Sequence, residues 1–210
     1  MAIEIRPFIL GPIENNTYLI SDKSSGEAVL VDPAVPSKEI CGFLEKNHLV
    51  LKEVWITHAH FDHIGGVQWF LEQCAPQAQA VMHQEAIPLW KTGGGAEDFG
   101  FEFDPGNVPE KIITENDVLN IGSSNFTVLH TPGHTPGHVT FYSPQDAIAF
   151  CGDLIFYHSV GRTDLGNSDS SKLLKTIREK NITLPEHTVL YPGHGPFTTV
   201  GEEKANNPFL

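Results

Sequence analysis

Residues 57–63 carry the side chains with the clearest chemistry in this chain, in the pattern His58-x-His60-x-Asp62-His63. Neutral imidazole is the side chain that most often binds metals in proteins, and nitrogen and oxygen ligands suit zinc, iron, nickel and copper. His58 and His60 are two residues apart, so in an extended segment their side chains point the same way. We therefore expect these two to face one ion, and Asp62 and His63 to face a second ion beside it.

Three later turns repeat one device, in which a glycine at a strand end precedes a residue that can bind metal. They are Pro132-Gly133-His134, Gly152-Asp153 and Pro192-Gly193-His194. Glycine allows backbone dihedrals and close approaches that other residues do not. If these turns meet the first motif, two ions can share one carboxylate. We assign His58, His60 and His134 to the first ion. Asp62, His63 and His194 are assigned to the second ion, and Asp153 is expected to bridge the two.

This ligand set predicts a hydrolytic reaction. Two divalent cations about 3.5–4 Å apart lower the pKa of a shared water and produce hydroxide near neutral pH. The expected step is attack of this metal-bridging hydroxide on a carbonyl carbon, with the metals stabilising the oxyanion. A thiolate leaving group needs little protonation, because the pKa of a thiol is about 8.5. Asp62 would also orient the water, so the candidate catalytic residues are Asp62 and Asp153.

Short strands that alternate with helices must position these residues. The apolar run at 51–56 predicts the strand that delivers the first motif, and a helical pattern opens behind the motif at Gly65-Gly66. That position argues against the alternative of an accidental surface cluster of histidines. The run 28–31 is apolar throughout, which predicts a strand buried on both faces. Strands come in two series, each interrupted by helices, and this predicts two packed sheets with helices outside.

Other residues have weaker signals. Arg162 follows Asp153 closely enough to reach the same cleft, where it could hold a substrate carboxylate; a salt bridge to Asp164 is the alternative. His138 is expected to form a structural hydrogen bond, or else to support a ligand. Residues 90–106, rich in glycine and phenylalanine, predict a loop that is either a lid over the site or a segment packed on the surface.

Composition limits the classes of partner and compartment. The 210 residues predict a single domain over residues 1–210, and the net charge of −13 argues against nucleic acid as a partner. Cys41, Cys74 and Cys151 show neither metal-type nor disulfide-type spacing, so we expect each to pack as a free, small apolar side chain in a reducing compartment. The first twenty residues lack a signal-peptide pattern and no apolar run could span a bilayer, so we expect a cytoplasmic protein without a membrane partner.

The ligand pattern resembles that of the metallo-β-lactamase superfamily at every position. The match covers nearly the whole chain, from the first motif to His134, Asp153 and His194. The resemblance implies a fold of the α/β (α+β) class, a four-layer αβ/βα sandwich with the metals at the rim between the sheets. It also implies two divalent metal ions as cofactors, expected to be zinc, with iron or manganese as alternatives.

Within this superfamily, the segments 131–138 and 191–195 are most similar to glyoxalase II, hydroxyacylglutathione hydrolase. The segment 161–164 and the C-terminal residues 201–209 resemble the short bacterial type of that family. The resemblance implies a thioesterase whose small-molecule substrate is S-D-lactoylglutathione, hydrolysed to D-lactate and glutathione. Only sixteen residues follow His194, so the C-terminal helical domain that grips glutathione in the longer enzymes has no counterpart here.

The main alternative is a persulfide dioxygenase, which the chain resembles in the segment 161–164. Such an enzyme has a mononuclear iron site held by two histidines and one aspartate, and His58, His134 and Asp153 would supply them here. A non-enzymatic binding domain that kept the fold would instead have lost ligands, and all seven are present in this chain.

Overall fold

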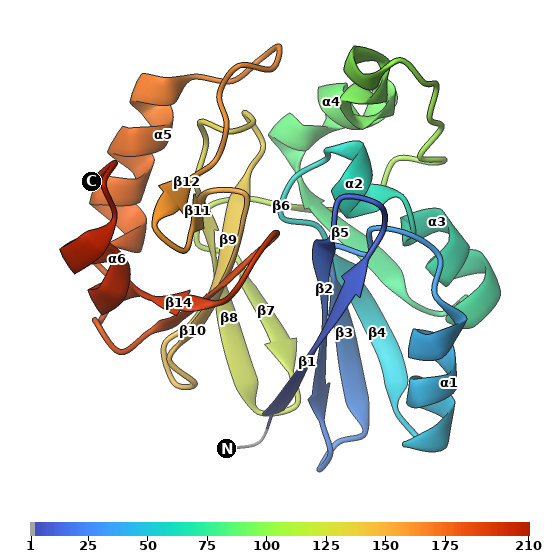
Figure 1. The fold of residues 1–210 in the computed structure, drawn as a ribbon. Coiled ribbons are helices and arrows are strands. Elements are labelled where there is room, and N and C mark those ends of the chain that lie inside the picture. Colours follow the sequence, from blue (N-terminus) through green and yellow to red (C-terminus); the bar gives the residue numbers. More distant parts are fainter. Residues whose placement is uncertain (1–2) are drawn as a thin grey trace.

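Two six-stranded sheets pack face to face in the structure, a computed structural model that describes residues 3–210 (Figure 1). The order in the first sheet is β1 (Ile3–Leu10), β2 (Asn15–Asp22), β3 (Glu27–Val31), β4 (Val50–Trp55), β5 (Gln79–His83) and β6 (Lys111–Ile113). Strands β1 to β3 are antiparallel, whereas β3 to β6 run parallel. Parallel neighbours need crossover connections, and helical segments supply those that follow β3, β4 and β5.

The second sheet comes entirely from the later part of the chain. Its order is β14 (Thr198–Thr199), β13 (Val189–Pro192), β10 (Ile148–Gly152), β9 (Val139–Ser143), β8 (Ser124–His130) and β7 (Val118–Ile121). Only β10 and β13 are parallel to each other in this sheet as described. A small hairpin between the ligand turns consists of β11 (Ile155–Phe156) and β12 (Ser159–Val160).

Helices cover the outer face of each sheet (Figure 1). Outside the first sheet lie α1 (Lys38–Lys46), α2 (Phe61–Ile64), α3 (Val67–Trp69), η1 (Phe70–Cys74), η2 (Gln84–Ala86), α4 (Ile87–Lys91) and η3 (Gly93–Phe99). Outside the second lie α5 (Ser170–Thr176), η4 (Ile177–Asn181) and α6 (Val200–Asn206). This arrangement confirms the predicted four-layer sandwich. None of the described helices has the length and apolar character needed to cross a membrane.

Three apolar clusters hold the four layers together. In β3, Ala28 and Leu30 pack toward the helices, while Val29 and Val31 pack toward the second sheet. The strand is therefore buried on both faces, as its unbroken apolar run predicts. A third cluster joins the second sheet to α5 and α6.

Trp55 is the largest side chain in the cluster between the sheets. It is fully buried, with ring centroids 5.0 Å from Phe126 and 5.1 Å from Phe141. We expect Trp55→Ala to lower the free energy of unfolding by about 3–5 kcal/mol, because it leaves a cavity between two sheets that cannot close over it. Urea denaturation of this variant and of Trp55→Phe measures the effect. A loss below about 1 kcal/mol for the alanine variant would contradict this account of the core.

The cysteines depart from the sequence-based expectation. Cys41 in α1 and Cys74 in η1 form a disulfide, with their Cα atoms 5.8 Å apart, whereas Cys151 is free and buried. The expectation of three free thiols was therefore wrong for one pair. The sequence separation of 33 residues conceals that the two helices lie side by side on the first sheet. Cysteine spacing therefore no longer supports a reducing compartment.

Candidate metal centre

The loop after β4 presents the first group of candidate ligands. Asp32, at the end of β3, fixes this loop: its carboxylate accepts hydrogen bonds from the backbone N–H of Thr57 at 2.8 Å and from the Thr57 hydroxyl at 2.5 Å. Asp32 has a φ of 48°, in the left-handed region. The backbone turn after the strand thus brings a buried carboxylate under the loop that carries His58 and His60.

The second sheet supplies its candidate ligands from three loops at strand ends. His134 follows β8, Asp153 follows β10 and His194 follows β13. The side-chain amide of Asn16 in β2 donates hydrogen bonds to the carbonyl oxygens of Pro192 and Gly195, at 3.1 and 2.7 Å. These bonds tie the His194 loop of the second sheet to the top of the first sheet (Figure 1).

Three histidines meet with their ring nitrogens in contact. His58 Nε2 lies 3.0 Å from His60 Nδ1, and His134 Nε2 lies 3.2 Å from the former and 2.9 Å from the latter. Nitrogens on a tetrahedral zinc ion, at about 2.0–2.1 Å from the metal, lie roughly 3.3 Å from one another. The spacing of this trio is therefore close to that of ligands on one cation.

The other group combines carboxylates with imidazoles. Asp62 Oδ2 lies 3.1 Å from His194 Nε2 and 3.5 Å from His63 Nε2. Asp153 stands between the two groups: its Oδ1 is 3.3 Å from His63 Nε2, and its Oδ2 is 3.7 Å from the Nε2 atoms of both His134 and His194. This carboxylate touches both groups, as a bridging ligand would.

In the described chain, two buried polar atoms of this centre lack a hydrogen bond, and bound cations would satisfy them. Within residues 3–210, His63 Nε2 and Asp153 Oδ1 have no hydrogen-bond partner although both atoms are buried. A buried polar atom without a partner is costly, and a cation between the two would satisfy both. The seven side chains therefore fit divalent metal ions, by their donor types as well as their spacing.

The protonation states differ between the two groups. Burial, together with the neighbouring ring of His134, lowers the pKa of His60 to about 3. Burial also lowers the pKa of His58 well below its ordinary value, so these rings are neutral and keep a lone pair for a metal. Burial would lower the pKa of His63 too, but the charges of Asp153 and Asp62 outweigh it and hold that pKa well above normal. Without a metal, the second group is thus a cluster of charge pairs.

The structure brings all seven predicted ligands together, and their metal-binding role stays a prediction. His138, expected to make a structural hydrogen bond, lies 2.8 Å by its Nδ1 from the Thr131 hydroxyl. Arg162 forms the salt bridge considered as the alternative, with Nε and Nη2 each 2.7 Å from the Asp164 carboxylate. Its backbone oxygen accepts a hydrogen bond from His134 Nδ1 at 2.8 Å, which orients that ring.

Asp32 is the functional residue that sequence reasoning missed. Besides holding Thr57, its Oδ2 lies 2.9 Å from His63 Nδ1, and it thereby leaves Nε2 of that ring free to face the centre. The only signal was its place at the end of an apolar strand, without the glycine that precedes the ligand in the three later turns. A residue that orients a ligand in this way acts on metal affinity through the ligand.

We therefore expect Asp32→Ala to weaken metal binding by about 10–100-fold, because His63 loses the partner that fixes its orientation. Metal titration against a competing chelator measures the change. Asp117→Ala, at a turn on β7 away from the centre, is the control. Equal metal affinity in the Asp32 and Asp117 variants would show that Asp32 does not position the site.

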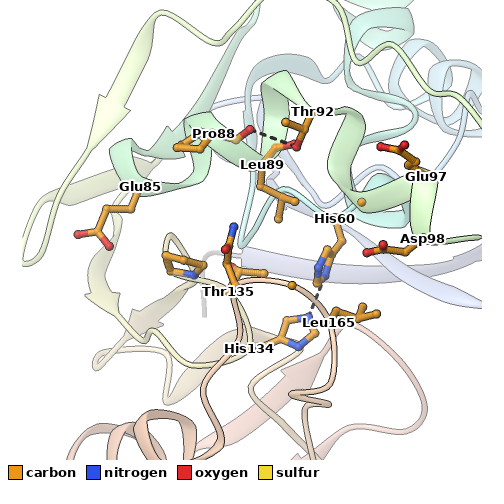
Figure 2. A pocket seen from close by; sticks show the side chains of 14 residues that line it. His60, Glu85, Pro88, Leu89, Thr92, Glu97, Asp98, His134, Thr135 and Leu165 are labelled. Carbon is orange, nitrogen blue, oxygen red and sulfur yellow. Dashed lines mark hydrogen bonds between the residues drawn. The ribbon is translucent and has the colours of Figure 1, made fainter.

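Two cavities open beside the centre and share His60, His134 and Leu165. One, of about 400 Å³, is lined by residues of the second group, by Arg162 and by the apolar side chains Ile13, Phe61, Phe99, Phe156 and Val160. The other, of about 390 Å³, lies against His60 and His134 beneath η2, α4 and η3 (Figure 2).

Residues 90–106 flank both cavities, and they contain more regular structure than the predicted loop, since η3 occupies 93–99. The Phe99 ring lies 5.2 Å from that of Phe61. This contact holds the segment beside the candidate metal centre, a position that a lid over the site would need. The lid function itself stays a prediction.

A model of the metallo-beta-lactamase superfamily matches residues 10–194. Among curated proteins, the chain is 32% identical to hydroxyacylglutathione hydrolase GloC of Haemophilus influenzae, over 100% of this chain and 98% of that one. It is 36% identical to the probable metallo-hydrolase YqgX of Bacillus subtilis, over 96% and 94% of the two chains.

Solved structures show the same similarity. The BLEG-1 B3 metallo-beta-lactamase has a TM-score of 0.92 and 35% identity, with 99% of each chain covered. TTHA1623 in a di-iron-bound form has a TM-score of 0.85 and 36% identity, covering 98% of this chain and 100% of that one. ETHE1 from Myxococcus xanthus has a TM-score of 0.79 and 28% identity, covering 98% and 83%.

Proposed function

Because this chain belongs to the metallo-β-lactamase superfamily, we propose that it is a metal-dependent thioesterase that hydrolyses S-D-lactoylglutathione to D-lactate and glutathione. The observation that carries the proposal is the pair of ligand groups joined by Asp153. The similarity to a hydroxyacylglutathione hydrolase along the whole chain supports the choice of substrate.

The ligand set divides between two proposed cations. The first would be held by His58, His60 and His134, the second by Asp62, His63 and His194, and both by Asp153. When bound, such a pair lowers the pKa of a water between the ions and stabilises negative charge on a carbonyl oxygen. We propose zinc, and the di-iron form of TTHA1623 makes iron the first alternative, since imidazole and carboxylate accept both metals.

The protein side chains supply orientation and a partly dry pocket. Asp32 and the Arg162 carbonyl hold the rings of His63 and His134 from behind, so both Nε2 atoms face the centre. We propose that Asp62 orients the attacking water, because its Oδ2 lies 3.1 Å from His194 Nε2 and the residue lines the 400 Å³ cavity. The aromatic side chains Phe61, Phe99 and Phe156 line the 400 Å³ cavity and would exclude part of the water around the reacting carbonyl.

Arg162 is the proposed contact for a substrate carboxylate. Its guanidinium is half-exposed, lines the same cavity and already grips one carboxylate, that of Asp164, with two parallel hydrogen bonds. A substrate carboxylate that replaced Asp164 would keep this two-pronged geometry. We propose the cytoplasm as the location, because glutathione thioesters belong to reducing compartments.

A persulfide dioxygenase is the second candidate, because its smaller ligand set is also assembled here. His134 Nε2 lies 3.2 Å from His58 Nε2 and 3.7 Å from Asp153 Oδ2, which is a compact site for one iron. Metal analysis of the purified protein, combined with a thioester panel and an oxygen electrode, separates the two. We expect two metal ions per chain, hydrolysis of S-D-lactoylglutathione and no oxygen uptake with glutathione persulfide. A single iron with oxygen uptake would overturn the hydrolase proposal.

A further inference from the structure

The cavity of about 390 Å³ beside the first histidine group has an acidic lining (Figure 2). Three acidic residues line it, Glu85, Glu97 and Asp98, and apart from His60 and His134 no basic side chain of the described chain lines it. In Figure 2, Glu97 and Asp98 lie on the side of His60, and Glu85 lies at the opposite end. Acidic residues therefore stand at both ends of the cavity.

Two of these carboxylates carry uncompensated charge. Among residues 3–210, neither Glu97 nor Asp98 forms an ion pair. Gly95 separates Asp98 from the metal centre: a Cβ atom there would lie 3.7 Å from His60 Cδ2 and 4.0 Å from Asp98 Oδ2. With a φ of +77°, this position favours glycine, and the absent side chain leaves the way open between the acidic group and the proposed first cation.

Thr135 gives an independent sign of a ligand in the same cavity. It directly follows the candidate ligand His134, lines the cavity and is only 4% exposed. Within the described residues its hydroxyl has no hydrogen-bond partner, although the atom is buried. A buried hydroxyl without a partner is unfavourable, and a polar group of a ligand bound here would remove that cost.

We propose that this acidic cavity, defined by Glu85, Glu97, Asp98 and Thr135, binds a positively charged group of the substrate, such as an ammonium. The inference deepens the proposed function and rests on it for the identity of the reacting group. The apolar side chains of Pro88, Leu89 and Leu165 would contact the carbon atoms that bear the charge. In a glutathione thioester, the α-ammonium of the glutamyl residue is the group with this chemistry, while a carboxylate of the same molecule would reach Arg162.

Binding of choline provides a test that needs no catalysis. Saturation-transfer NMR compares choline with 3,3-dimethylbutan-1-ol, which has the same shape without the charge. We expect choline to bind about 3- to 10-fold more tightly, the range that one or two exposed charge pairs supply. The double variant Glu97→Gln/Asp98→Asn should lose this preference, and so should the unmodified protein at about 1 M salt.

Glu39→Gln/Glu45→Gln in α1 is the matched control, because it removes the same two charges from exposed positions outside the cavity. This control should keep the preference for choline. Equal binding of the two probes to the unmodified protein, or an equal loss in both double variants, would overturn the proposal, since the effect would then reflect net charge alone.

Thioester hydrolysis separates this proposal from the proposed function. The ratio of kcat/KM for acetylthiocholine to that for its neutral isostere, S-(3,3-dimethylbutyl) thioacetate, should exceed one and fall toward one in Glu97→Gln/Asp98→Asn. If no thioester is hydrolysed but choline is still preferred, the thioesterase proposal fails and the cationic subsite stands. If both thioesters are hydrolysed with equal efficiency and choline is not preferred, the cationic subsite fails and the thioesterase proposal stands.

Discussion

Asp153→Ala is expected to abolish turnover, with a loss of kcat/KM of at least about 10³-fold, and to leave the protein with fewer than two bound metals. Within residues 3–210, Asp153 is the carboxylate with oxygen atoms less than 4 Å from nitrogens of both ligand groups. Its removal also takes away the carboxylate that faces His134 and one of the three carboxylates that surround His63. Loss of a residue that only orients a ligand costs about 10–100-fold, so direct participation in both sites should cost more. Metal content by mass spectrometry and thioester hydrolysis measure the two effects.

The control for this variant is Asp146→Ala, which removes a carboxylate from a turn that ends at β10, away from the centre. It should keep both metals and full activity. An Asp153→Ala protein that retained its thioesterase rate would show that the acidic bridge is not needed. It would then contradict the proposed chemistry, in which Asp153 joins the two ligand groups.

Gly193→Ala is expected to reduce activity by about 10²-fold through a shift of two proposed ligands. A Cβ atom at this position would lie 2.2 Å from Asp153 Oδ1 and 2.5 Å from His63 Cε1. The backbone cannot retreat, because Gly193 N–H donates to the Gly152 carbonyl at 2.9 Å and its own carbonyl accepts from the Asn16 N–H at 2.7 Å. The ligands must therefore move, and a displacement of about 1 Å in a catalytic centre can cost about 10²-fold.

Kinetics and metal affinity of Gly193→Ala test this expectation. Gly42→Ala in α1 is the control, since a Cβ there meets nothing within 4 Å and alanine favours a helix. This control should leave activity unchanged. Its free energy of unfolding should stay the same or rise slightly. Normal metal content and normal turnover in Gly193→Ala would contradict this expectation. They would show that the loop carrying His194 can move away from Asp153 and His63 without loss of function.

The sequence was sufficient for the fold and the grouping of candidate ligands because both depend on local patterns. Apolar runs that end in turns specify where strands stop, and a residue directly after such a stop lies at the rim of a sheet. His134, Asp153 and His194 lie one to four residues after their strands, each directly after a glycine. At Gly193 a side chain would collide with the centre, whereas at Gly133 it would collide with Leu173 of α5.

What the sequence did not reveal arises from contacts between distant segments. Asp32 and Pro33 look like an ordinary turn, and only the folded chain places the Asp32 carboxylate under Thr57 and His63. Cys41 and Cys74 pair because two helices share one face of the first sheet. The acidic cavity combines the segment 85–98 with residues 134–136 and 165–167, and no local pattern links them.

The two sheets divide the chain at one point. Every strand of the first sheet comes from residues 3–113, and every strand of the second from residues 118–199. The earlier half contributes His58, His60, Asp62 and His63, and the later half contributes the remaining three proposed ligands. Each proposed cation would therefore be a non-covalent cross-link between the two halves. If the chain were cut in the turn at 114–117, neither fragment could complete a coordination shell alone, and reassociation of the fragments would become metal-dependent.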